Sequence, residues 1–347
     1  MRKYVSFLLV FYFSFWFSSF AQISNSSRIK IATDIQQELF PVIAKFVSEG
    51  NQYSNIPSLV KWNIQNANND SVQISITSDI PEWTEPSIST VILGPNENKE
   101  IMQTPFGNKL LRNHSIVPAT ILLKVKQGDR NIFEETKKIR VRAADDMVWS
   151  LNTPYDTEPL IAAWVTPNDD MVEKILSNAK ERRFFNRSLS GYQSNDVVQQ
   201  VKAIFNAVRN YRVSYVNSTM SFGKIGFTQR VRLPRESILE KSANCIDGAV
   251  LFASLFENIG LEPVIVLIPG HAFVGVRLAQ NSKETLFIET TIVGRSSLNS
   301  ILTVTTTFDA AVKEGNDEFN KAMQTNPNSV RIVDIKKARE TGIYPLW

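Results

Sequence analysis

Residues 242–291 read SANCIDGAVLFASLFENIGLEPVIVLIPGHAFVGVRLAQNSKETLFIETT, and this stretch decides the fold of the C-terminal half. Apolar residues at helical spacing follow Cys245, and Gly260 is placed to end that helix. The run VIVLI at 264–268 is typical of a buried strand, and residues 271–278 and 285–290 predict two more strands. A helix followed by an antiparallel sheet indicates the α+β class.

Cys245 opens the predicted helix and is the only cysteine of the chain. Unpaired backbone N–H groups and the helix dipole stabilise an anion at a helix N-terminus, a setting that favours a reactive thiolate. The same N–H groups can hold an oxyanion during acyl transfer. The alternative is a buried, inert thiol, because free cysteine is among the most buried residue types.

His271 and Glu289 supply the partners that a cysteine nucleophile needs, an imidazole and a group that orients it. A hairpin centred on Gln280 would make them direct cross-strand neighbours, with Cβ atoms about 5 Å apart. Each also has a structural alternative: His271 as a hydrogen-bonded strand residue, and Glu289 as a solvated acid. A nucleophile–imidazole contact within about 4 Å in an open cleft would favour an enzyme. A sealed Cys245 would favour a binding protein.

The rest of the chain divides into two parts with different periodicity. Alternating residues between about 58 and 143, separated by polar turns, predict an antiparallel β-sandwich of immunoglobulin-like type, to which residues 22–56 can add a strand or helix. After Asp146 the spacing becomes helical. Helices are predicted after Asp169, after Asp196 and over 308–323, and a last strand over 330–335. We therefore expect a signal peptide at 1–21, a sandwich domain at 22–146 and a catalytic domain at 147–347.

The N-terminus has the pattern of a secretory signal. Basic Arg2 and Lys3 precede the apolar run from Val5 to Phe20, and Ala21 ends a small-residue cleavage pattern. The alternative is an uncleaved anchor, although the run is shorter than the roughly 20 residues that span a bilayer. Export to the periplasm or the extracellular space is therefore expected, with no transmembrane segment after cleavage.

The composition excludes several classes. One cysteine permits no intramolecular disulfide, and two histidines are too few for a histidine-rich metal cluster. His114 lies in a polar stretch and is expected to be a solvated loop residue. The net charge of +4 comes from interleaved basic and acidic residues, which does not indicate a nucleic-acid partner. We expect no cofactor and no metal.

Residues 242–291 resemble the transglutaminase-like superfamily of papain-fold cysteine enzymes, in a bacterial branch. The matching features are Asn-Cys at a helix start, LFASL at 251–255, GLEP at 260–263, HAF at 271–273 and Glu-Thr at 289–290, with QRVRLP at 229–234 upstream and TTIV at 290–293 downstream. The resemblance implies Cys245 as nucleophile, His271 as general acid/base and Glu289 as the orienting acid. The superfamily most often has Asp where Glu289 stands and Trp where Phe273 stands, and these departures weaken the case for a true transglutaminase more than the case for a cysteine hydrolase. The sequence does not choose between hydrolysis and transamidation; hydrolysis is favoured because cross-linking also requires an organised amine site that excludes water.

This resemblance implies that the protein is an exported peptidase or amidase that forms an acyl-enzyme on Cys245. Gln229 is a candidate oxyanion donor, because papain-fold enzymes often use an upstream side-chain amide; Asn244 is a second candidate, or else the cap of the Cys245 helix. The expected partner is a protein or peptide substrate, and export makes the cell envelope a natural place for it. The alternative is an inactive transglutaminase-like fold that serves as an envelope protein-binding module.

Overall fold

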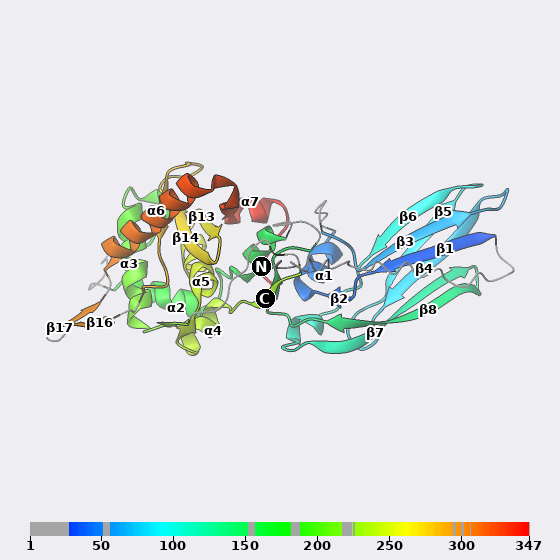
Figure 1. Cartoon of the computed structure of the whole chain (residues 1–347), viewed down its shortest axis with the longest axis horizontal. Coiled ribbons are helices and arrows are strands. Elements are labelled where there is room, and N and C mark those ends of the chain that lie inside the picture. The colour runs from blue at the N-terminus through cyan, green and yellow to red at the C-terminus, as the bar shows by residue number, and fades with distance from the viewer. Residues whose placement is uncertain are drawn as a thin grey trace, which may run out of the picture.

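The chain adopts a mixed α+β architecture with several antiparallel sheets, as expected from the sequence. In this computed structural model, residues 28–50, 56–151, 157–181, 188–216, 224, 226–293, 296–299, 302–305 and 307–346 are described. Figure 1 shows an elongated molecule in which a β-rich N-terminal part and a helix-rich C-terminal part lie at opposite ends. The predicted signal peptide, residues 1–21, lies outside the described residues.

Two sheets form the N-terminal part. One has the order β1-β3-β6, and the other has the order β2-β8-β7-β4-β5, in which the short β2–β8 pair is parallel and the remaining pairs are antiparallel. Their strands are β1 (Ile29–Ile35), β2 (Glu38–Leu39), β3 (Val60–Asn66), β4 (Val72–Asp79), β5 (Ser87–Leu93), β6 (Asn98–Gln103), β7 (Val117–Gln127) and β8 (Arg130–Val141).

Both sheets contribute to one hydrophobic core. The alternation predicted from the sequence is visible in β3 and β4, where Trp62, Ile64, Ile74 and Ile76 are buried and the residues between them are more exposed. Polar Gln103 is also buried, and its side-chain oxygen accepts hydrogen bonds from Trp62 Nε1 at 3.1 Å and Ser78 Oγ at 2.9 Å. The burial of these amide and hydroxyl groups is therefore compensated.

Helix α1 (Pro41–Ser48) joins the two parts of the molecule. Its residues Val42, Ile43 and Phe46 belong to the core of the C-terminal part, although in the sequence the helix lies between strands β2 and β3 of the N-terminal part. Lys45 Nζ donates a 3.0 Å hydrogen bond to the carbonyl of Pro345. The domain boundary between residues 146 and 147 stays a prediction. Helix α1 precedes this boundary in the sequence, yet it packs against the C-terminal part. His114 is exposed in a loop, as predicted.

The C-terminal part is built on the four-stranded antiparallel sheet β15-β14-β13-β18. Alternate side chains of its strands face two helices. Ile265, Leu267 and Val274 pack in the large core with α5, whereas Val266 and Phe273 form a smaller core against which Phe319 and Ala322 of α6 pack. The sheet is formed by β13 (Pro263–Ile268), β14 (His271–Arg277), β15 (Thr285–Ile288) and β18 (Arg331–Asp334), and the two covering helices are α5 (Cys245–Asn258) and α6 (Phe308–Thr325).

The other helices follow the predicted starts. Asp169 caps α2 by accepting a hydrogen bond from the Met171 N–H, and α3 begins directly after Asp196. Helices α4 (Pro234–Leu239) and α7 were not predicted; α7 starts at the end of β18, where the sequence predicted only a strand. The remaining elements are α2 (Asp170–Ala179), α3 (Val197–Asn210), α4 (Pro234–Leu239), α7 (Ile335–Glu340), β9 (Asp146–Val148), β10 (Ser214–Tyr215), β11 (Thr228–Arg230), β12 (Ser242–Ala243), β16 (Ser296–Asn299) and β17 (Leu302–Thr305), with short 3-10 turns at Leu110–Arg112, Glu158–Trp164, Gly191–Gln193 and Pro327–Ser329.

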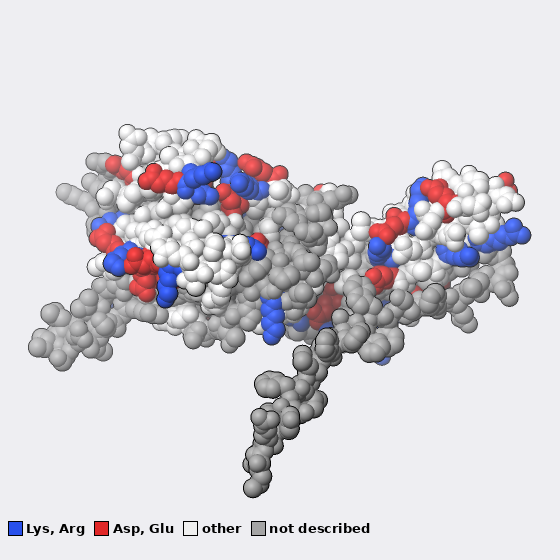
Figure 2. Space-filling model, turned by 45° about the horizontal axis from the view of Figure 1, so that its top comes forward, with Lys and Arg blue, Asp and Glu red and all other residues white. Residues whose placement is uncertain are grey.

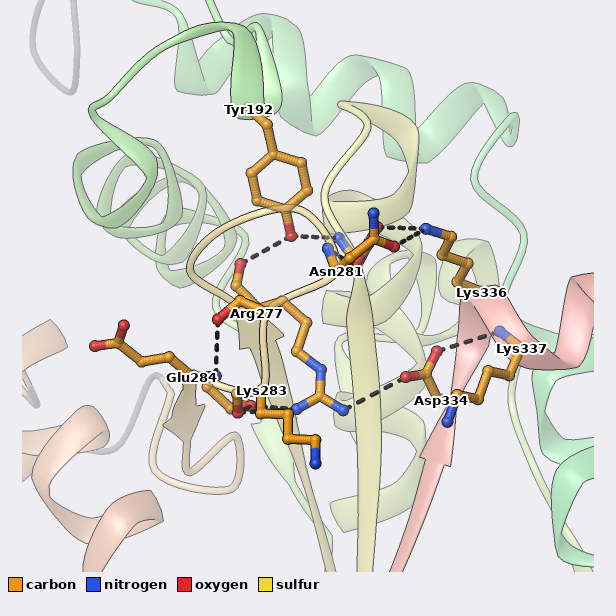
Figure 3. A network of polar contacts seen from close by, with 11 residues as sticks. Tyr192, Arg277, Asn281, Lys283, Glu284, Asp334, Lys336 and Lys337 are labelled. Carbon is orange, nitrogen blue, oxygen red and sulfur yellow. Dashed lines mark hydrogen bonds and ion pairs between the residues drawn. The ribbon is translucent and has the colours of Figure 1, made fainter.

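A polar network fastens the turn end of the β14–β15 hairpin to its neighbours (Figure 3). The Tyr192 hydroxyl donates to the carbonyl of Arg277 at 2.9 Å and accepts from the Glu262 N–H at 3.0 Å, and burial raises the pKa of Tyr192 to about 12. Lys336 Nζ contacts Glu262 Oε1 at 2.8 Å and Asn281 Oδ1 at 2.6 Å. This end of the sheet is therefore held rigidly, while the opposite end carries His271.

Figure 2 shows Lys and Arg mixed with Asp and Glu on the face in view, without a large area of one sign. Among the described residues, no helix is both long enough and apolar enough to cross a membrane.

Candidate active site

Cys245 is the first residue of α5, and the turn before it is fixed by reciprocal capping. The Asn244 side-chain oxygen accepts from the Asp247 N–H at 3.0 Å, and the Asp247 carboxylate accepts from the Asn244 N–H at 3.0 Å. Asp247 is fully buried and also accepts from Arg232 through its backbone N–H at 2.9 Å and through Nη1 at 3.1 Å. The helix start, and with it the cysteine, is thus held at a defined place.

His271 and Glu289 meet at the open end of the hairpin, where Nε2 of His271 lies 2.6 Å from Oε2 of Glu289. The predicted register was wrong. Val274 pairs with Ile288 and Arg277 with Thr285, so the turn is centred on Asn281 and β15 ends before Glu289. The contact survives because the shift leaves Glu289 diagonal to His271 on the same face of the sheet, within reach of a long side chain.

Glu289 is almost completely buried, and hydrogen bonds fix both its side chain and its backbone. Its Oε1 accepts from the Thr291 N–H at 2.7 Å, and its own backbone N–H donates to the carbonyl of Ala311 in α6 at 3.0 Å. Burial acts to raise the pKa of Glu289, but hydrogen bonding and charge from His271, together with the Thr291 hydrogen bonds, outweigh it and lower the pKa. Glu289 is therefore ionised at neutral pH.

The imidazole of His271 also contacts Cys245. Burial acts to lower the pKa of His271, but polar contacts with Cys245, Glu289 and Glu318 and the charge of Glu289 outweigh it and raise the pKa to about 12. Because both carboxylates contact Nε2, the other ring nitrogen, Nδ1, remains for the cysteine. The three residues predicted from the sequence thus come together, in the order thiol, imidazole and carboxylate.

Glu318 in α6 also contacts His271 and was not predicted from the sequence. Its Oε2 lies 3.2 Å from Nε2 of His271, so two carboxylates face one edge of the imidazole. Glu318 lies 29 residues beyond Glu289 in a separate helix. The signal in the sequence is the spacing Ala311, Gly315, Glu318, Ala322, which follows one face of a helix.

The two oxyanion candidates have different surroundings. Asn244 is the helix cap, as the alternative interpretation expected, and its side-chain oxygen is engaged by Asp247. Gln229 lies in β11, where it pairs with Met147 of β9, and three residues further on Arg232 contacts the first turn of α5. An oxyanion role for either residue stays a prediction.

The surroundings of Cys245 are closed and largely apolar. Cys245 is only 1% exposed, whereas the side chain of His271 is 21% exposed. A depression of about 310 Å³, part of which is open to solvent, adjoins the sequence neighbours of Cys245 and Glu289. Its lining consists of Val208, Val213, Tyr215, Ala243, Asn244, Gly248, Leu251, Phe252, Thr290 and Val293.

His271, Glu289 and Glu318 offer one nitrogen and two oxygens within 4.8 Å of one another, a spacing that a cation could also use. The 2.6 Å hydrogen bond and the 3.2 Å ion pair already account for this spacing.

Comparison with known proteins yields little. No family model matches the chain, and no curated protein matches it. Among solved structures, native alpha-2-macroglobulin from Escherichia coli, in a crystal structure spanning domain MG7 to the C-terminus, matches with a TM-score of 0.21 and 9% identity over 58% of this chain. This chain covers 36% of that structure, about a third of its length. So weak a likeness defines neither the fold family nor the function.

Proposed function

We propose that this protein is an exported cysteine enzyme that acts on amide or peptide bonds, most simply as a peptidase or amidase. The Cys245 thiolate would attack the carbonyl carbon, and the bond to the leaving amine would break after the imidazolium of His271 donates its proton to that amine. Water, deprotonated by His271, would then attack the acyl-enzyme, and breakage of the C–S bond would release the acid and regenerate the thiolate–imidazolium pair. Glu289 would orient the imidazole and stabilise its positive charge.

One observation carries this proposal: the His271 imidazole contacts Cys245 and also lies 2.6 Å from the buried carboxylate of Glu289. A core cysteine with a structural role needs no such partner, since a thiol is easily buried among apolar side chains. The position of Cys245 at the start of a capped helix adds backbone N–H groups and a favourable dipole for an anion.

The same proposal extends to the family and the fold. We infer a transglutaminase-like, papain-fold catalytic part, with Cys245, His271 and Glu289 as its triad, preceded by an immunoglobulin-like sandwich that positions the substrate or docks the enzyme. The helix α5, followed by the antiparallel strands β13, β14 and β15, is consistent with such a part. Residues 1–21 would direct export, so a peptide or protein of the cell envelope is the substrate class we favour.

A second function, a non-catalytic binding module, is favoured by the burial of Cys245. A thiol that is 1% exposed cannot meet a substrate without movement of the side chains that cover it. In that case the His271–Glu289 pair would be a structural ion pair.

One experiment distinguishes these two functions. The protein is incubated with a peptide digest of an unrelated protein and a biotinylated primary amine. Mass spectrometry of products from the wild type and from Cys245→Ala would reveal new peptide termini or deamidated glutamine for hydrolysis, and biotin on glutamine for transamidation. We expect hydrolysis products that require Cys245. Identical product profiles from the two proteins would favour the binding module.

A further inference from the structure

We propose that Glu318 is a second positioning carboxylate for His271: it holds the imidazole as a cation facing Cys245, in addition to the orienting contact that Glu289 makes. This inference deepens the proposed function and rests on it for its catalytic meaning, whereas the charge state of His271 can be measured without any substrate.

The first argument is the chemistry of the shared edge. Nε2 of His271 carries at most one proton, which the 2.6 Å contact directs at Glu289. The side chain of Glu318 is 33% exposed, but its Oε2, 3.2 Å from the same nitrogen, is buried, and the described residues offer that oxygen no hydrogen-bond donor in suitable geometry. A buried carboxylate oxygen without such a donor is unfavourable unless a positive charge lies beside it. The imidazolium form of His271 supplies that charge.

The second argument is the way α6 is seated. An alanine side chain at Gly315 would place its Cβ 2.8 Å from the backbone N of Ile288 and 2.9 Å from that of Glu289, so only glycine allows this approach. The Glu289 N–H donates to the carbonyl of Ala311 in the same helix. Glu318 stands three residues after Gly315, on the face of α6 that is turned to the sheet. The contact that locates Glu289 therefore also brings Glu318 to His271.

The third argument is the set of titratable groups that contact the imidazole of His271. Among the described residues these are Cys245 from α5, Glu289 just beyond β15 and Glu318 from α6. Two of the three are carboxylates, and both act to keep a proton on the ring. The raised pKa of His271 agrees with this arrangement, and its causes include the contact with Glu318.

Nuclear magnetic resonance of the imidazole rings tests the proposal directly, because the chain has only two histidines and exposed His114 serves as an internal reference. Glu318→Gln should lower the titration midpoint of His271 by about one pH unit or more, a tenfold loss of proton affinity. Glu318→Asp retains the charge but withdraws the carboxylate, so it should give a smaller decrease. The matched control is Asp317→Asn, which removes the same charge from the adjacent residue, whose carboxylate pairs with Lys313.

A His271 midpoint in Glu318→Gln equal to that in Asp317→Asn, with both proteins folded by circular dichroism, would overturn the proposal. If Glu318→Gln does not fold, the same comparison is made with Glu318→Asp. Failure of the proposed function looks different: Cys245 would react as an ordinary thiol in the wild type while the His271 midpoint still responded to Glu318. The two failures are therefore distinguishable.

Discussion

The carboxylate of Glu289 lies 2.6 Å from the His271 imidazole although the two residues are not opposite each other in the hairpin. β15 ends at Ile288, and the chain after it is held by α6 through the hydrogen bond from the Glu289 N–H to Ala311. The pair therefore depends on three elements: β14, the end of β15 and α6. Its geometry makes several outcomes predictable.

Replacing Glu289 with glutamine should weaken both the site and the fold. The amide keeps the shape of the side chain, but it removes the negative charge, and its single oxygen can accept a hydrogen bond from only one of His271 and the Thr291 N–H. We expect a loss of about 1–3 kcal/mol in the free energy of unfolding, typical of a buried charged hydrogen bond. Urea denaturation at pH 7 measures it. Glu284→Gln, at an exposed position in the same hairpin, is the control and should change stability by less than about 0.5 kcal/mol.

The contribution of His271 to the stability of the protein should decrease above about pH 6.5. Below the ordinary histidine pKa of about 6.5 the ring is protonated in both states. Above it, the unfolded chain loses the proton while the native state retains it up to about pH 12. The contribution of His271 is thus complete at low pH and falls by at most about 1.4 kcal/mol per pH unit as the pH rises.

His271→Gln isolates this effect. In a Cys245→Ala background, where no thiol titrates together with His271, the difference in unfolding free energy between the proteins with and without His271→Gln should shrink from pH 7 to pH 9, because the other titrating groups largely cancel in the comparison. A difference that stays constant over this range would show that His271 is neutral in the native protein.

Gly315→Ala should destabilise the protein, although alanine is the better helix former by about 1 kcal/mol. The new Cβ would meet backbone atoms of Phe287, Ile288 and Glu289, so α6 has to shift. Overpacking of this kind costs about 1–3 kcal/mol before the helix gain is subtracted. Thermal unfolding checks the sign, with Asn320→Ala on the exposed face of α6 as the control. A raised melting temperature for Gly315→Ala would contradict the close approach.

Asp247→Ala should be among the most damaging single changes near the site. It removes one half of the capping box, leaves the N–H groups of Asn244 and Arg232 without their acceptor, and leaves the Arg232 guanidinium with Glu240 as its remaining carboxylate partner. We expect a loss of about 3–5 kcal/mol, as when one partner of a buried ion pair is deleted. Denaturant unfolding measures it. Asp309→Ala, an exposed acid in the first turn of α6, should cost about 1 kcal/mol or less.

The sequence predicted the local elements of the C-terminal part well, because helix caps and apolar periodicity are local signals. Asp169 before α2 and Gly260 after α5 show this. The residues Cys245, His271 and Glu289 could also be selected from their types and order. Their spatial contact could be predicted only approximately, since hairpin register depends on where the turn forms, and here it forms one residue later than expected.

Glu318 could not be selected from the sequence, because its relation to His271 depends on the seating of α6 against β15. That seating rests on Gly315, whose close approach to Glu289 is a long-range contact. The sealing of Cys245 is likewise a tertiary property, because it depends on how distant segments pack over the start of α5.

The most direct test of the central claim is the rate at which iodoacetamide alkylates Cys245 as a function of pH, in wild type and in His271→Ala. An isolated thiol reacts with a midpoint near its ordinary pKa of about 8.5. We predict labelling in the wild type that persists well below pH 7 and that is slowed at least tenfold at pH 6 by His271→Ala. Labelling that follows an ordinary thiol and is indifferent to His271, while urea-unfolded protein labels normally, would contradict a thiolate–imidazolium pair.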